Sequence, residues 1–172
     1  SAGAFTENRF FASPVKISRE HLACGPSRGV IVNSGNANCA NGAKGDQSAR
    51  DMAHAAGKLL GIRQEAVLVA STGIIGRSLP IQNITKAMPK LVSGLNKEKG
   101  KLFARSIMTT DTVPKESCVQ ITLGESKVFI AGACNTGQAQ AVNETGGELC
   151  HLPDALVRAG GRQEVDDAEA VR

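Results

Sequence analysis

Two short segments place hydroxyl groups where they could act in catalysis or binding. Ser71-Thr72-Gly73 directly follows an apolar run, so a hydroxyl and a glycine N–H at a strand's end could donate hydrogen bonds to a developing oxyanion. Met108–Thr112 carries three threonine hydroxyls and one carboxylate, which could hold a polar substrate. Local sequence leaves the alternatives open: a plain turn for the first segment, and a helix cap followed by a strand for the second.

A third segment, residues 33–45, is polar and rich in glycine and asparagine, and it lies between a predicted strand and a predicted helix. Such a loop could bind an anion at the helix N-terminus. It matches neither the dinucleotide-binding nor the P-loop glycine pattern, and Asp46 would itself occupy the helix cap. We therefore interpret it as a structural connector in preference to a nucleotide site.

Other reactive residues lack the partners that their chemistry requires. Ser13-Pro-Val-Lys16 fits the S-x-x-K pattern of serine acyl-enzymes, but the companion S-D-N and K-T-G motifs are missing, so we interpret the match as coincidence. The histidines have no metal-ligand spacing, and we predict surface or packing roles and no metal site for His21, His54 and His151.

Cysteine content and charge restrict the class of protein. The five cysteines form no C-x-x-C pair and are odd in number, so we expect reduced, buried thiols in a cytoplasmic protein. The net charge of +4 comes from scattered basic residues, and the chain has neither Trp nor Tyr, so nucleic-acid binding is not expected. No apolar run reaches the roughly 18 residues that a membrane-spanning helix needs. The chain begins without Met, and we expect a fragment or a processed chain.

The elements that must position these segments alternate between strand and helix, which predicts an α/β fold. β-branched apolar runs predict buried strands at Gly29–Asn33 and Ala66–Ala70. Asp46 and Gly61 predict the start and stop of a helix over about 47–60. The remaining expected elements are short strands at Ala2–Thr6 and Pro14–Ser18, a helix from Pro80 that Pro89 kinks or splits, a helix over 98–108, and a hairpin over 119–130 around Gly124-Glu125-Ser126.

Several of these segments, taken in order, resemble the α-chain motifs of bifunctional ornithine acetyltransferases (N-acetylglutamate synthases). N-S-G-N-A-N, A-S-T-G-x-I-G and M-T-T-D-T are each fairly specific, and all three occur in the family's order. The resemblance covers about residues 1–133 and starts inside the family's usual N-terminus. The segments that carry it are Ala4–Phe10, Pro14-Val15, Val32–Asn38, Val69–Gly76 and Ile107–Lys115.

The resemblance implies transfer of acetyl from N-acetylornithine to glutamate in cytoplasmic arginine biosynthesis, without a cofactor, although some members also take acetyl from acetyl-CoA. It implies the logic of N-terminal-nucleophile hydrolases, in which a precursor cleaves itself at an Ala-Thr bond and the freed threonine attacks. By motif, Thr72 and Gly73 match the oxyanion-hole pair, and Thr109 matches a substrate-binding threonine. The resemblance also implies a layered α/β body that is incomplete without the β chain, in an α2β2-type assembly.

The match stops after the predicted hairpin. Asn135 stands where the family has a substrate-binding lysine, and no Ala-Thr pair occurs in residues 113–172, so this chain lacks an assignable nucleophile. Residues 1–134 carry 17 basic and 9 acidic residues, whereas residues 135–172 carry 3 and 7.

We therefore divide the chain into an α-chain-like domain, residues 1–133, and an unrelated acidic tail, residues 134–172. Our hypothesis for the tail is a frame shift, altered splicing or gene decay. The sequence predicts the α portion of an acetyltransferase that is inactive alone. The alternatives are a non-catalytic small-ligand binding protein and a non-functional product of a frameshifted gene.

Overall fold

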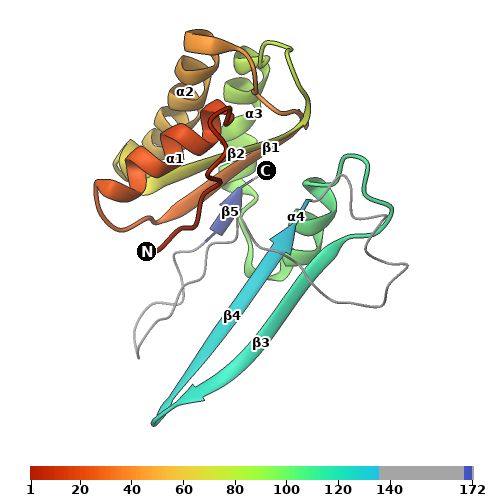
Figure 1. Ribbon diagram of the computed structural model, residues 1–172. Helices are drawn as coiled ribbons and strands as arrows, with labels where there is room; N and C mark the ends of the chain where they lie inside the picture. The colour runs from red at the N-terminus through yellow and green to blue at the C-terminus, as the bar shows by residue number, and fades with distance from the viewer. Residues whose placement is uncertain (136–168, 172) are drawn as a thin grey trace.

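The computed structural model describes residues 1–135 and 169–171, and these residues form two separate sheets with helices. A parallel sheet has the strand order β2-β1-β5, and an antiparallel pair consists of β3 and β4. The α/β class predicted from the sequence is confirmed (Figure 1). The helices are α1 Ser13–Ala23, α2 Gly42–Leu60, α3 Ile81–Ser93 and α4 Gly100–Ser106, with short 3-10 turns η1 Gln64–Ala66 and η2 Lys97–Lys99.

The two central strands are β1, Gly29–Asn36, and β2, Val67–Ile74, which pair in parallel along their whole length. β5, Glu169–Val171, pairs in parallel with β1 at Gly29–Ile31. Both strand predictions are therefore confirmed, and each strand continues a few residues beyond its apolar run into the polar motif that follows. That extension places the two motifs on strand ends instead of in free loops.

One hydrophobic core lies between β1, β2 and the first three helices. α1 and α2 contact β2, and α3 packs on α2 (Figure 1). Apolar residues recur on α2 at the spacing of one helix face, and its left-handed cap at Gly61 ends it as predicted. The fully buried members of the core include Ile17, Ile31, Ala49, Met52, Ala53 and Met88.

The N-terminal region differs from the sequence prediction. Pro14–Ser18, predicted as an extended strand, belongs to α1, and Ala2–Thr6 forms no strand. Proline is tolerated in the first helical turn because its missing N–H would have no partner there. Ile17, Ser18 and His21 then bury one face of the helix, a pattern that also satisfies helical spacing.

Two further helix boundaries also differ. α2 begins at Gly42, ahead of the predicted cap, so that Asp46 lies inside the helix, where its carboxylate accepts a hydrogen bond from Lys16 Nζ at 2.5 Å. α3 continues through Pro89 as one helix, since Pro89 is exposed and only one turn follows it. The predicted helix over 98–108 is η2 followed by α4.

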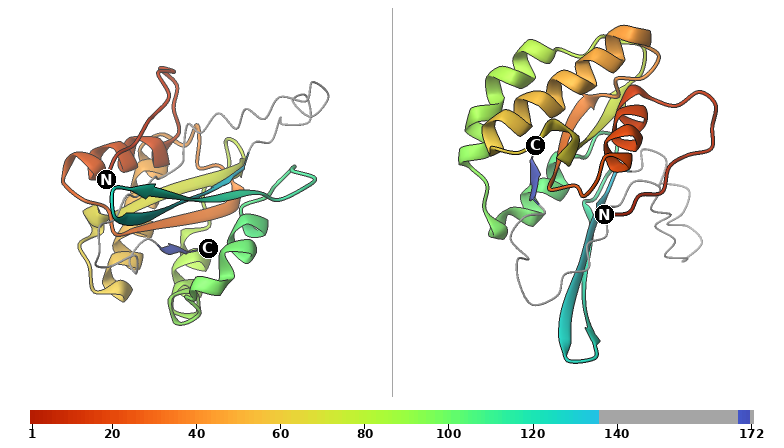
Figure 2. Two further views of the ribbon diagram at one scale, coloured as in Figure 1. Left: turned by 90° about the horizontal axis from the view of Figure 1, so that it is seen from below. Right: turned by 90° about the vertical axis from the view of Figure 1, so that its left-hand side faces the viewer.

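The hairpin is confirmed, with β3 at Lys115–Leu123 and β4 at Ser126–Cys134. It extends away from the helices, as Figure 1 and the right-hand view of Figure 2 show. Residues paired in an antiparallel register share a face, so Val119, Ile121 and Leu123 lie on the same face as Val128 and Ile130. Val119 is 50% exposed and Leu123 is 58% exposed, which leaves part of this apolar face uncovered.

Within the described part of the chain, none of the helices combines the length and the apolar character needed to cross a bilayer.

Candidate functional site

The carboxyl ends of β1 and β2 bring two of the sequence motifs side by side. In the parallel register Ser34 lies beside Thr72, and Gly35 lies beside Gly73. Segments 38 residues apart in sequence thus form one edge of the sheet, where ligands of open α/β sheets commonly bind. This pairing places the predicted oxyanion pair, Thr72 and Gly73, directly against the N-S-G-N motif.

Gly73 is at a position that admits no side chain. Its φ is +130°, and a Cβ built on it would lie 2.3 Å from the Gly35 carbonyl carbon and 2.5 Å from the Asn36 nitrogen. Gly35 also has a positive φ, +99°, but a Cβ there would meet open space. The close approach of the two backbones therefore depends on glycine at position 73.

The hydroxyls of Ser71 and Thr72 differ in whether they have a hydrogen-bond partner. Ser71 Oγ donates to Asn33 Oδ1 across the two strands, and Asn33 Nδ2 in turn donates to the Asn36 carbonyl at 3.0 Å. The half-buried Thr72 hydroxyl has no hydrogen-bond partner within residues 1–135. Ser71 is thus structural in this arrangement, and Thr72 retains a hydroxyl that can donate to a ligand.

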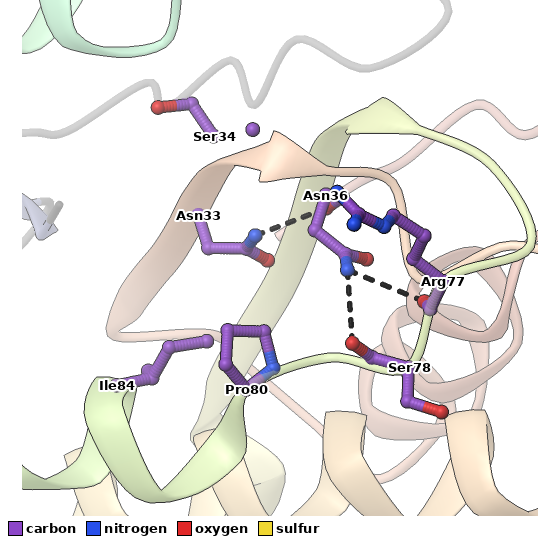
Figure 3. Close-up of a pocket in the computed structure, with 8 residues that line it drawn as sticks. Asn33, Ser34, Asn36, Arg77, Ser78, Pro80 and Ile84 are labelled. Atoms are coloured by element: carbon purple, nitrogen blue, oxygen red, sulfur yellow. Dashed lines mark hydrogen bonds between the residues drawn. The ribbon is translucent and has the colours of Figure 1, made fainter.

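The asparagines of the loop after β1 bind backbone groups of the loop after β2. Asn36 Nδ2 donates to the carbonyls of Arg77 at 3.2 Å and Ser78 at 3.1 Å (Figure 3), and Asn41 Nδ2 donates to Arg77 at 2.7 Å. Asn38 is fully buried and donates to the Gly45 carbonyl at 2.9 Å. These contacts join the two loops, in agreement with the interpretation of residues 33–45 as a structural connector.

An open pocket of about 460 Å³ lies at this end of β1 (Figure 3). It is lined by residues 33–36 of β1, by Arg77, Ser78 and Pro80, and by Ile84 of α3. Arg77 is the charged residue of this lining. Sequence reasoning missed Arg77, because an isolated arginine after a glycine turn carries no local signal of a pocket.

Thr109 is connected to this edge indirectly. Ser34 Oγ donates to the Ser106 carbonyl at 2.7 Å, which holds the end of α4 against β1. Three residues further on, the exposed Thr109 accepts a hydrogen bond at Oγ1 from Asn135 Nδ2 at 3.2 Å. The Asn135 amide also donates to the Ile107 carbonyl. The Met108–Thr112 segment is thus connected by hydrogen bonds to β1, which carries the N-S-G-N motif, and to the end of β4.

The S-x-x-K match has an evident structural use. Lys16 forms an ion pair with Asp46, and the hydrogen bond and charge of Asp46 raise the pKa of the Lys16 amine. Burial opposes ionisation of Asp46, but the hydrogen bonds from Lys16 and Ser13 outweigh it and lower the pKa of that carboxyl. A lysine held as a cation is a poor general base, which supports the interpretation of this match as coincidence.

The histidines and cysteines that the structure describes lie outside this site. His21 is buried, with Nδ1 2.7 Å from the Val67 carbonyl, so it has the predicted packing role, and the exposed His54 lies beside Gln64. The expectation of buried thiols is wrong for Cys24 and Cys118, which are exposed, while Cys39 and Cys134 are half-buried. These four are on polar loops, a helix cap and the projecting hairpin, outside the core. His151 and Cys150 lie outside the described residues.

The protein thus belongs to the α/β class and carries a threonine–glycine pair at the carboxyl edge of its parallel sheet. The model of the ArgJ family matches residues 1–139, and the chain belongs to this family.

Two bifunctional arginine-biosynthesis proteins, both named ArgJ, are among its relatives. The protein of Methylococcus capsulatus is 42% identical over 131 residues, which is 76% of this chain and 32% of that protein. The protein of Dehalococcoides mccartyi is 44% identical over 133 residues, 77% of this chain and 32% of that protein. The chain thus spans about a third of the length of these curated relatives.

Solved structures show the same similarity. The ornithine acetyltransferase of Mycobacterium tuberculosis, in complex with ornithine, is 30% identical with a TM-score of 0.72, and the match covers 80% of this chain and 74% of that chain. The ArgJ protein of Bacillus halodurans is 31% identical with a TM-score of 0.71, covering 80% and 73%.

Proposed function

We propose that this chain is the α portion of an ornithine acetyltransferase, which transfers acetyl from N-acetylornithine to glutamate in arginine biosynthesis. One observation carries the proposal. The half-buried Thr72 hydroxyl is without a partner among the described residues, and it precedes a glycine whose backbone approaches β1 as closely as glycine allows. A hydroxyl and an adjacent N–H at a strand end are suitable donors for an oxyanion.

In the proposed mechanism a nucleophile outside the described residues attacks the acetyl carbonyl, and the carbonyl oxygen becomes an oxyanion. Thr72 Oγ1 and the Gly73 N–H stabilise that charge by hydrogen bonds. Collapse of the tetrahedral intermediate breaks the C–N bond and releases ornithine with a proton on its amine. The amine of glutamate then attacks the acetyl-enzyme, and the same two donors stabilise the second intermediate. Its collapse breaks the bond between the acyl carbon and the nucleophile, which regains a proton from the amine as N-acetylglutamate leaves. Thr109 contacts the substrate in this proposal.

The nucleophile would come from a β portion, because residues 113–172 contain no Ala-Thr pair. The partly uncovered apolar face of the β3–β4 hairpin supports this requirement, since Val119 and Leu123 at half exposure are costly to leave in water. We propose that the β portion covers this face, that the two form an α2β2-type assembly, and that this chain alone is inactive.

A second candidate function is non-catalytic binding of a small ligand. The open pocket beside Arg77 favours it, because the lining residues are present without any β portion. The two functions differ in one respect: binding by this chain alone suffices for the second, whereas the first needs acyl transfer when a β portion is added.

The test is an acetyl-transfer assay from N-acetylornithine to glutamate, with and without a purified β portion from the Methylococcus capsulatus relative. We expect activity only with the β portion, and Thr72→Ala should lower kcat about 100-fold, the usual effect of losing one oxyanion donor.

Thr85→Ala is the matched control, because that hydroxyl donates within α3 to the Ile81 carbonyl at 3.0 Å and should leave kcat unchanged. An acetyl adduct on this chain alone would contradict the proposal. Wild-type kcat in the Thr72 variant would contradict the oxyanion role.

A further inference from the structure

The pocket at the end of β1 combines a cation with uncharged polar groups. Arg77 is the charged residue among the described lining residues, and none of these is a carboxylate. Within residues 1–135, the Arg77 guanidinium has neither an ion-pair nor a hydrogen-bond partner. Its five N–H donors are therefore available to a ligand, and their planar arrangement matches a carboxylate.

The backbone that carries Arg77 is fixed in place. Its carbonyl accepts hydrogen bonds from both Asn36 Nδ2 and Asn41 Nδ2, and the neighbouring Gly76 N–H donates to the Cys39 carbonyl at 2.9 Å. Gly76 adopts a φ of +76°, which sets the direction of the loop as it enters Arg77. An arginine on a loop held by three hydrogen bonds loses less entropy on binding than one on a free loop.

The rest of the pocket indicates the chemistry of the ligand. Ser78 offers a hydroxyl, and Asn33 keeps its second amide N–H, because the first donates to the Asn36 carbonyl. The Ser34 hydroxyl already donates to the Ser106 carbonyl. Pro80 and Ile84 form an apolar wall. The volume of about 460 Å³ suits a small molecule, and the lining residues that the structure describes include no aromatic side chain on which a base could stack. These features fit a short aliphatic carboxylate better than a nucleotide.

The position of the pocket connects it with the proposed oxyanion donors. Ser34 and Gly35 line the pocket and are also the register partners of Thr72 and Gly73 on β2. We infer that this pocket is a carboxylate site in which Arg77 binds a carboxylate of the amino-acid substrate. Recognition of a small carboxylate follows from the pocket itself, and its assignment to the substrate rests on the proposed function.

The experiment measures binding of glutarate, a dicarboxylate without an amine to be acetylated, to the full chain by isothermal titration calorimetry. Wild type should bind, and Arg77→Gln should bind at least about tenfold more weakly, as expected for one charged hydrogen-bond partner. Arg77→Lys should fall between them because it keeps the charge but loses the bidentate geometry. The matched control is Arg9→Gln, an exposed arginine of the N-terminal segment, which should bind as wild type does.

The inference is overturned if glutarate does not bind the wild-type chain, or if Arg77→Gln binds it equally well. Glutarate binding that depends on Arg77 supports the carboxylate site even when no acetyl transfer is found, and only the proposed function then fails. Acetyl transfer with an unchanged KM for glutamate in Arg77→Gln would leave the proposed function standing and overturn the assignment to the substrate.

Discussion

Replacing Gly73 with alanine tests the strand approach on which the proposed oxyanion pair depends. The new Cβ would lie 2.3 Å from the Gly35 carbonyl carbon, 2.5 Å from the Asn36 nitrogen and 2.7 Å from the Gly35 Cα. All three atoms are backbone, so no side-chain rotation can relieve the overlap. The ends of β1 and β2 must therefore separate, and the edge that carries Thr72 moves with them.

The magnitude follows from comparison with the register partner, Gly35. Both glycines have positive φ, +130° and +99°, so alanine at either costs about 1–2 kcal/mol of backbone strain. Only Gly73→Ala adds the steric overlap, which costs about 1–3 kcal/mol when a packed site must shift. We expect Gly73→Ala to lower the free energy of unfolding by about 2 kcal/mol more than Gly35→Ala.

Urea unfolding of both variants and of wild type, followed by circular dichroism, measures this difference. The midpoints should fall in the order wild type, Gly35→Ala, Gly73→Ala, with similar slopes. Equal losses in the two variants would refute the reasoning, because the close contact would then contribute nothing beyond the backbone conformation.

Two further predictions concern the helices and loops that support the site. Because hydrogen bonds from Lys16 and Ser13 hold the pKa of Asp46 below its usual 3.8, its contribution to stability is present above that pH and is lost as the pH falls through the lower folded value. Asp46→Asn should therefore lower the urea midpoint at about pH 7 and lower it less at about pH 3; an unchanging difference would contradict this. Asn38→Ala should cost about 1–3 kcal/mol, since it removes the buried donor to the Gly45 carbonyl, whereas the exposed Asn83→Ala on α3 should cost less than about 0.5 kcal/mol by the same measurement.

Local patterns in the sequence were sufficient for most of the elements. The β-branched runs predicted β1 and β2, the glycine at position 61 predicted the end of α2, and the period-two pattern around Gly124 predicted the hairpin. Each of these signals depends on a few neighbouring residues, so no tertiary contact was needed to interpret it. The family motifs likewise could be recognised from their residues and their order.

Where two local conformations were both acceptable, tertiary packing decided. Pro14 is compatible with an extended strand and with a first helical turn, and the burial of Ile17 and His21 against the core selects the helix. Asp46 could cap α2, but Lys16 on the neighbouring α1 makes a better partner. Such choices depend on side chains about 30 residues away in the chain, and sequence windows do not include them.

The candidate site likewise has one part that the sequence predicted and another that only tertiary structure decided. The sequence by itself limited the oxyanion donors to Ser71-Thr72-Gly73 at a strand end, and the family motif within it indicated Thr72 and Gly73. Only the parallel register of β1 and β2 placed Gly35 against Gly73, and only the asparagine contacts between the two loops placed Arg77 at the pocket. The physical reason is that strand pairing and loop-to-loop hydrogen bonds join residues that are distant in the chain, so the geometry of the site exists only once both strands are docked.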